Sequence, residues 1–208
     1  MSNPNEPISQ LLDAEERWFA VYTRFKREKM VRKRLLSKGV ETYLPLQRTT
    51  RYYTRKIVQR DLPLISCYVF VKIARRGYVQ VLEDPDVLYF VKQKSDLIAI
   101  PEREINILKA ITGEGIQLEV TPLEKDPLPG DEVEIIQGRL FGLRGTLVEH
   151  QNNRRVVIEL EQMGFALRLH LEMNQIRRTG NRKKIAETNR NTAPKGVKAE
   201  KKGSFTKF

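Results

Sequence analysis

Cysteine and histidine are scarce in this chain of 208 residues, which carries one cysteine and two histidines. The single cysteine, Cys67, has no partner for an internal disulfide, and the three side chains together fall short of the four ligands of a usual zinc site. No segment approaches the eighteen or more apolar residues of a membrane span, and the polar N-terminus lacks the layout of a signal peptide. We therefore expect a cytoplasmic protein with no membrane contact, no metal and no other cofactor.

Catalytic patterns are missing as well. The two histidines, His150 and His170, fall at expected strand positions, where a packed or exposed histidine is the default. No glycine-rich phosphate loop precedes a helix, and the carboxylates in the middle of the chain show no motif spacing. The sequence therefore predicts a binding protein rather than an enzyme.

Positive charge is abundant but unevenly spread. The formal net charge is +12, and residues 17–60 alone contribute +12 from 14 basic and 2 acidic side chains. Residues 177–208 add +9, whereas residues 1–16 and 61–176 sum to −4 and −5. Neutralising phosphates supplies most non-specific affinity for nucleic acids, so the first basic block predicts a nucleic-acid contact. Residues 127–174 hold 5 basic and 7 acidic side chains, which favours a protein partner for that segment.

Apolar periodicity divides the first half of the chain into strands and helices. Aromatic and β-branched residues dominate residues 17–23 and the run from Leu62 to Ile73, which predicts two buried strands. Helical spacing predicts a helix from Phe25 to Lys38 that stops at Gly39, and a second helix opens at Pro101. Other expected elements are strands over residues 41–46 and 87–91, a short helix over 75–83 and an exposed hairpin from Arg48 to Arg60.

A glycine-rich stretch from Gly130 to Glu149 carries the clearest motif of the second half. Gly138, Gly142 and Gly145 punctuate a loop between two runs that alternate as short strands do. Three glycines within eight residues suit a small, strongly curved barrel. Further strands are expected over residues 154–160, 165–171 and 174–178.

These patterns predict an α+β fold, with an N-terminal antiparallel sheet flanked by helices followed by a small C-terminal β-barrel. The tail is rich in charged and small residues, so it cannot bury enough surface to become ordered. The expected segments are a flexible N-terminus over 1–16, a first domain over 17–112, a linker over 113–129, a barrel domain over 130–178 and a disordered basic tail over 179–208.

The order of these elements resembles the NusG family of transcription factors. The segments WFAVYT, ETYLP, LISCYVFVKI and VLYFV, followed by the helix at Pro101, resemble the NusG N-terminal domain. The stretch from Gly130 to Glu149 resembles the KOW motif, which implies an SH3-like barrel. The resemblance covers residues 17–178. It implies a monomeric transcription elongation or antitermination factor that binds RNA polymerase through its N-terminal domain and suppresses pausing or termination.

Two departures from the typical family sequence favour a specialised paralogue over a general NusG protein. Where typical members carry Phe-Phe-Pro-Gly-Tyr-Val, this chain has LISCYV from Leu64 to Val69. In the KOW loop, Gly-Arg-Leu from Gly138 to Leu140 replaces Gly-Pro-Phe. These differences suggest a member similar to RfaH or to UpxY-like antiterminators.

The resemblance also implies where the polymerase binds. Family members contact it through an apolar depression around the central strand, and the corresponding residues here are Trp18, Leu64, Ile65, Tyr68 and Phe70. An apolar patch centred on an aromatic residue is a common anchor of such interfaces. Holding the polymerase in its processive form requires only a higher affinity for that state, so no catalytic group is needed.

The basic face of the first domain is the candidate nucleic-acid site, directed by resemblance at the upstream or non-template DNA. It comprises Arg24, Lys26, Arg27, Arg32, Arg51, Tyr52, Tyr53 and Arg55. The two tyrosines are candidates to stack on an unpaired base between cations. The alternatives are a solvated helix face for the cations and cross-strand packing for Tyr52 and Tyr53.

The C-terminal domain is the candidate site for a second partner. Its glycine loop contains Arg139, Leu140, Phe141 and Arg144, and the resemblance implies a small-subunit ribosomal protein or Rho as the partner. The alternative is a ribosomal-type or other RNA-binding KOW protein. Such a protein would carry its positive charge in the barrel rather than in the first half of the chain.

Overall fold

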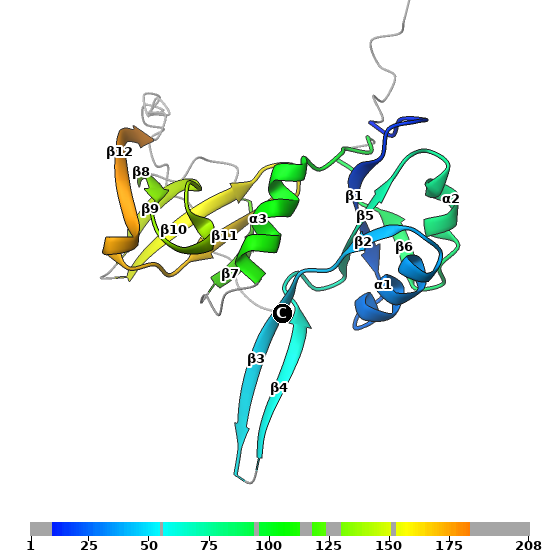
Figure 1. Ribbon diagram of the computed structural model, residues 1–208, viewed down its shortest axis with the longest axis horizontal. Coiled ribbons are helices and arrows are strands. Elements are labelled where there is room, and N and C mark those ends of the chain that lie inside the picture. The colour runs from blue at the N-terminus through cyan, green and yellow to red at the C-terminus, as the bar shows by residue number, and fades with distance from the viewer. Residues whose placement is uncertain are drawn as a thin grey trace, which may run out of the picture.

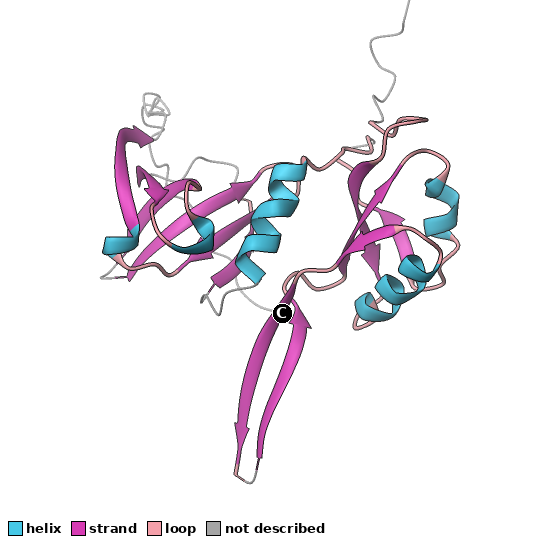
Figure 2. Ribbon diagram, in the orientation of Figure 1, coloured by secondary structure: helices cyan, strands magenta, loops and turns pink. Residues whose placement is uncertain are grey.

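The computed structural model describes residues 10–54, 56–93, 96–112, 118–123, 130–150 and 153–183. An antiparallel four-stranded sheet with the order β2-β5-β1-β6 forms the N-terminal half (Figures 1 and 2). Its strands are β1 (Arg17–Thr23), β2 (Glu41–Tyr43), β5 (Tyr68–Ile73) and β6 (Val87–Phe90). This confirms the predicted N-terminal antiparallel sheet.

Helices cover both faces of this sheet. Side chains of β1 alternate between the faces. Phe19 and Val21 share a core with α1 (Glu28–Ser37) and α2 (Gly77–Leu82). Trp18 and Ala20, on the other face, share a core with α3 (Glu102–Thr112). Both faces are buried, which explains why the segment RWFAVYT shows no alternation of polar and apolar residues.

The first helix ends where the sequence predicts. Gly39 adopts a φ of +81°, a left-handed conformation that costs glycine little. The backbone N–H of Val40 then donates to the carbonyl of Leu35 at 3.0 Å, which satisfies an acceptor of the last turn. The helix begins at Glu28 rather than at Phe25, because Lys26 has a φ of +62° and cannot belong to a right-handed helix.

The long apolar run from Leu62 to Ile73 is not one strand, contrary to the prediction. β4 (Lys56–Pro63) ends at its proline, and β5 begins only at Tyr68. Between them Cys67 takes a φ of +65°, which turns the chain out of extended geometry. Apolar composition alone does not reveal such a turn, since buried turn residues are also apolar.

The predicted hairpin is confirmed and is longer than expected. β3 (Leu46–Tyr53) and β4 form a two-stranded sheet of their own, and this ribbon projects from the N-terminal half of the molecule (Figure 1). At its base the Lys29 ammonium of α1 donates to the backbone carbonyl of Asp61 at 2.5 Å.

The C-terminal half is a six-stranded antiparallel sheet with the order β12-β8-β9-β10-β11-β7. Glycine is required in this sheet at Gly145, where an added Cβ would lie 2.7 Å from the carbonyl of Val157. The strands are β7 (Leu118–Pro122), β8 (Gly130–Ile135), β9 (Arg144–His150), β10 (Asn153–Leu160), β11 (Phe165–Leu169) and β12 (Ile176–Lys183), with short 3₁₀ turns η1 (Gly138–Leu140) and η2 (Met173–Gln175).

This sheet does not close into the expected barrel. Among the described strands, β7 and β12 are its two edges and do not pair with each other. β7 lies within the expected linker and pairs with β11 from Leu118 opposite Leu169 to Pro122 opposite Phe165. Val120 and Leu118 pack against the core from this strand, so a segment without sustained periodicity still adds a strand to the sheet.

The two sheets share one hydrophobic core through α3. Ile105, Leu108 and Ile111 of the helix cluster with Trp18 of the first sheet and with Leu140 of η1, the turn between β8 and β9. Figure 1 shows α3 lying alongside the C-terminal sheet although it precedes it in the chain. A change in how the C-terminal sheet sits on α3 therefore affects one face of the N-terminal sheet.

Structured residues extend beyond the expected domain bounds at both ends of the chain. Leu11 lies within the expected flexible N-terminus, yet it is buried in the core that includes residues of α1 and α2, and the neighbouring Gln10 N–H donates to the carbonyl of Leu97. β12 extends to Lys183, past the expected start of the tail, and residues 184–208 lie outside the described residues. None of the described helices has the length and apolar character needed to cross a membrane.

Candidate functional site

A row of tyrosines crosses the N-terminal sheet. Tyr22 of β1 lies directly opposite Tyr68 of β5 and Tyr89 of β6 in the strand registers. Its ring meets that of Tyr68 edge-on at a centroid distance of 5.4 Å and stacks on that of Tyr89 at 5.2 Å. The row thus presents an aromatic surface about three strands wide, of which Tyr89 is 52% exposed.

The turn before β5 sets the position of Tyr68. The backbone N–H of Cys67 donates to the buried Glu28 carboxylate at 2.8 Å, and the Cys67 carbonyl accepts from the N–H of Thr23 at 2.8 Å. These bonds hold Cys67 in its left-handed conformation at the position where typical family members carry glycine. The residue just before Tyr68 is therefore fixed through both its N–H and its carbonyl group.

The C-terminal sheet covers the Tyr68 end of this row. The Phe165 ring of β11 meets the Tyr68 ring edge-on at 5.3 Å. Tyr68 is consequently half-buried, and burial raises the pKa of its hydroxyl above the ordinary value. A large partner reaches the Tyr68 ring only if Phe165 moves away.

Glu104 of α3 joins the same contact through hydrogen bonds. Its carboxylate accepts from the backbone N–H groups of Gln162 at 3.2 Å and Met163 at 3.3 Å, in the turn between β10 and β11. Glu104 is only 3% exposed. Burial raises the pKa of its carboxyl, and the two N–H donors act in the opposite direction. We call this packing of Phe165 on Tyr68 and of the 161–164 turn on Glu104 the closed arrangement.

Three of the five expected polymerase-binding residues are buried in the structure. Trp18 and Phe70 are 2% and 0% exposed, because α3 packs over both rings. The Trp18 indole N–H also donates to Glu102 at 2.8 Å, which fixes it to the start of α3. Ile65 is 5% exposed, and Leu64 packs against the same core. Leu64 and Tyr68 are the two expected anchors that are only partly buried.

Two acidic residues that the sequence did not place beside α1 neutralise part of the basic face. The Arg34 guanidinium donates to Asp84 and to Asp86, each at 2.7 Å, and Arg27 lies 3.9 Å from Asp86. Arg34 is thus a structural side chain, and its pairing leaves Asp84 with a pKa below the ordinary value although burial acts to raise it. The Asp-Pro-Asp turn was the available signal, but its position beside α1 depends on the tertiary fold.

The other expected nucleic-acid contacts lie in three regions. Arg24, Lys26 and Arg32 are exposed on or just before α1. Arg51 occupies a position on β3 of the ribbon, as do Tyr52 and Tyr53. Arg55 lies outside the described residues. α1 contacts the base of the ribbon through the bond from Lys29 to Asp61.

The expected partner-binding loop of the C-terminal sheet has one exposed apolar residue. Phe141 is 69% exposed, whereas Leu140 is 2% exposed and packs with α3. Gly138 and Gly142 have φ values of +74° and +81°, so the loop reverses tightly and turns Leu140 inward. Arg139 and Arg144 are exposed beside Phe141.

Comparison with known proteins places the N-terminal half. Residues 16–109 match the family model described as transcription termination factor NusG. These residues belong to the NusG family. The match runs from the start of β1 into α3, so it includes Tyr68 and the whole tyrosine row.

Two further similarities accompany this match. The chain is similar to a solved structure described as "Domain interaction in Thermotoga maritima NusG", with 20% identity, a TM-score of 0.49 and coverage of 79% of this chain and 98% of that one. It is also 33% identical over 70 residues to the 104 kDa microneme/rhoptry antigen of Theileria annulata. That segment spans 29% of this chain and 8% of the antigen.

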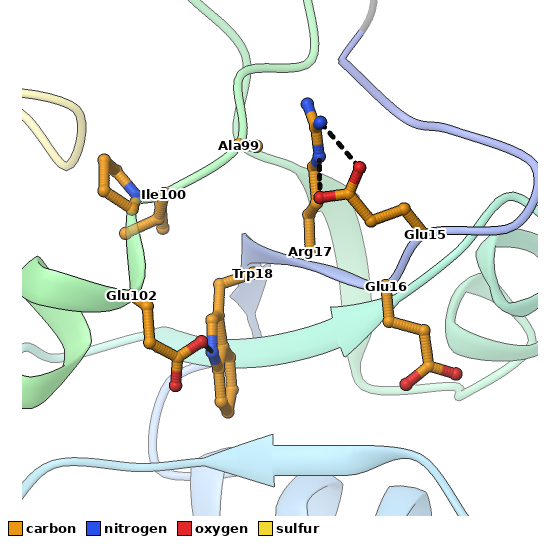
Figure 3. A pocket seen from close by; sticks show the side chains of 8 residues that line it. Glu15, Glu16, Arg17, Trp18, Ala99, Ile100 and Glu102 are labelled. Carbon is orange, nitrogen blue, oxygen red and sulfur yellow. Dashed lines mark hydrogen bonds and ion pairs between the residues drawn. The ribbon is translucent and has the colours of Figure 1, made fainter.

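A pocket of the NusG domain lies away from the tyrosine row. It is lined by residues near the starts of β1 and α3, among them Arg17, Trp18 and Glu102 (Figure 3). Its charged groups are already paired: Arg17 makes two bonds to Glu15 at 2.8 and 3.0 Å, and Glu102 holds the Trp18 indole. The bond from Trp18 to Glu102 ties β1 to the start of α3.

Proposed function

We propose that this chain is a transcription elongation or antitermination factor that binds RNA polymerase through the surface around Tyr68. The observation that carries this proposal is the coincidence of the NusG-family match over residues 16–109 with an aromatic row on the same domain. Aromatic side chains are common energetic anchors of protein interfaces. Binding that favours the processive state of the polymerase is sufficient for pause suppression.

The closed arrangement implies that docking is coupled to movement of the C-terminal sheet. Phe165 occupies one side of the Tyr68 ring, so polymerase and the C-terminal sheet compete for it. The apparent affinity for polymerase is then lower than the intrinsic affinity by the fraction of molecules in which the surface is open. Leu64 and Ile65 border Tyr68 and become accessible with it.

The C-terminal sheet is proposed to recruit a second protein. We place this role on Phe141, which is 69% exposed between Arg139 and Arg144. An exposed aromatic residue flanked by arginines has the composition of an interface core. We further propose that the partner of this part of the chain is a small-subunit ribosomal protein or Rho.

The basic residues of α1 and the ribbon are proposed to contact DNA near the polymerase. Arg24, Lys26 and Arg32 are exposed, and the ribbon that carries Arg51 extends from the same side of the domain at Lys29. Cations in this arrangement attract the phosphate backbone regardless of sequence. The replacement of Pro-Gly by Ser-Cys before Tyr68 supports a specialised paralogue.

Two single substitutions test the division of roles. Tyr68→Ala should weaken binding of the full chain to polymerase elongation complexes by about 1–3 kcal/mol, the range for an interface anchor. Phe141→Ala, on the other half of the protein, serves as the matched control and should leave polymerase binding unchanged. Circular dichroism establishes that both variants are folded. Full polymerase affinity in a folded Tyr68→Ala protein would rule out this docking surface.

A further inference from the structure

The β3–β4 ribbon separates its side chains onto two faces. Side chains alternate along a strand, so Lys56 and Arg60 share one face of β4, and Ile57, Gln59 and Asp61 lie on the other. Residues opposite each other in an antiparallel register point to the same face. The faces of the whole ribbon can therefore be assigned from its register.

The two faces differ in charge. Lys56 and Arg60 are both exposed, and within the described part of the chain neither forms an ion pair. On the other face Arg48 lies opposite Asp61, and the two side chains pair at 3.3 Å, Nε to Oδ1. That pair is neutral, and its face also exposes Ile57 by 64%. β3 contains no acidic residue that would offset the first face.

The spacing of the two cations matches a feature of duplex DNA. Arg60 follows Lys56 by four positions, which corresponds to about 14 Å at a rise of about 3.4 Å per residue. The major groove of B-DNA is about 12 Å wide and admits a two-stranded ribbon. A ribbon lying across the groove therefore brings one cation to the phosphates on each side.

The ribbon is also available for such a contact. Among the described strands, β3 and β4 pair only with each other, and the contact between Lys29 and Asp61 ties their base to α1. A two-stranded ribbon is only marginally stable by itself, so a partner that covers one face would help to order it. The charged face matches a polyanion, whereas the neutral face does not.

We infer that the ribbon lies across the major groove of duplex DNA, with the face of Lys56 and Arg60 toward the phosphates and the face of Ile57 and Gln59 away from them. The inference deepens the proposed function and rests on it for bringing the ribbon to DNA. It narrows the ligand to a duplex and the contact to one face of the ribbon.

Adjacent residues on opposite faces provide the test. Arg60→Gln and Gln59→Glu each lower the net charge by one, but only the first removes a cation from the proposed DNA face. Binding of the full chain to a duplex, and to a single strand of the same length, is measured by fluorescence anisotropy over about 50 to 200 mM salt. Each phosphate contact contributes about 0.9 to the slope of log affinity against log salt.

Arg60→Gln should reduce the size of the duplex slope by about 0.9, and adding Lys56→Gln should reduce it by about 0.9 again. Gln59→Glu should leave the slope unchanged, and the single strand should show a smaller difference between the variants. Equal effects of Arg60→Gln and Gln59→Glu would overturn the inference, because net charge alone would then explain binding. Equal losses on duplex and single strand would overturn the groove contact.

The measurement is independent of polymerase. If Tyr68→Ala retains full affinity for elongation complexes while the slopes change as expected, the docking proposal fails and the ribbon contact stands. If the slopes stay unchanged in folded variants while Tyr68→Ala weakens polymerase binding, the ribbon contact fails and the docking proposal stands. Thermal unfolding followed by circular dichroism verifies that each variant retains the fold.

Discussion

Removing the Glu104 carboxylate should release the C-terminal sheet from α3. In the closed arrangement this side chain accepts from the backbone N–H groups of Gln162 and Met163. Glu104→Ala leaves both groups without that acceptor, at a cost of about 1–3 kcal/mol for each donor that stays buried. The substitution also removes the desolvation penalty of a carboxylate that is 3% exposed. We expect a net destabilisation of the closed arrangement of about 2 kcal/mol.

A change of about 2 kcal/mol raises the ratio of open to closed molecules about 30-fold. Amide hydrogen exchange followed by mass spectrometry detects this change directly. Exchange should accelerate in peptides that contain residues 161–165 and 64–68, which face each other across the contact. Peptides from residues 17–23, which form the centre of the N-terminal sheet, should keep their protection because that sheet stays folded.

Glu102→Ala is the matched control. Glu102 lies on the same helix, two residues earlier, and accepts from the Trp18 indole within the N-terminal half. It makes no bond to the 161–164 turn in the described structure, so its loss should not accelerate exchange there. The reasoning would be refuted if folded Glu104→Ala showed unchanged exchange at residues 161–165, or if both variants accelerated it equally.

Three further outcomes are expected. Burial raises the pKa of Glu104 above its ordinary 4.5, so protonation of Glu104 favours the closed arrangement. The fraction of closed molecules, followed by NMR amide signals, should therefore grow as the pH falls through the raised pKa and level off below about 4.5. A constant fraction would contradict this. Gly145→Ala should lower the free energy of unfolding in urea by about 1–3 kcal/mol, because its Cβ would lie 2.7 Å from the Val157 carbonyl, and unchanged stability would show that the strand shifts freely. Arg34→Ala should cost about 3 kcal/mol in the same assay by leaving the buried Asp84 without its main partner, whereas a loss below about 1 kcal/mol would mean that water replaces the guanidinium.

The elements of the N-terminal half could be predicted because their signals are local. Glycine at the end of α1, proline before α3 and the aromatic strand from Arg17 to Thr23 each specify their conformation within a few residues. The division of the apolar run at Cys67 could not be predicted in this way. It depends on the bond from the Cys67 N–H to Glu28, a residue 39 positions away.

The candidate site required tertiary information for the same reason. The sequence identifies Tyr68 as an aromatic residue in a central strand, but only the strand registers place Tyr22 and Tyr89 beside it. The cover by Phe165 depends on how the C-terminal sheet packs on α3. Likewise, β7 is an edge strand of five residues, too short to show a periodic pattern. Its extended conformation comes from pairing with β11, which the local sequence does not reveal.

Competition between RNA polymerase and the C-terminal sheet for Tyr68 is tested most directly by titrating polymerase elongation complexes with the full chain carrying Phe165→Ala. This substitution removes the ring that covers Tyr68 and leaves the N-terminal sheet intact. An aromatic pair contributes about 0.5–1.5 kcal/mol beyond its buried area, so its loss should increase the affinity for polymerase by about 2- to 13-fold. Unchanged or weaker binding by the folded variant would contradict docking at this surface.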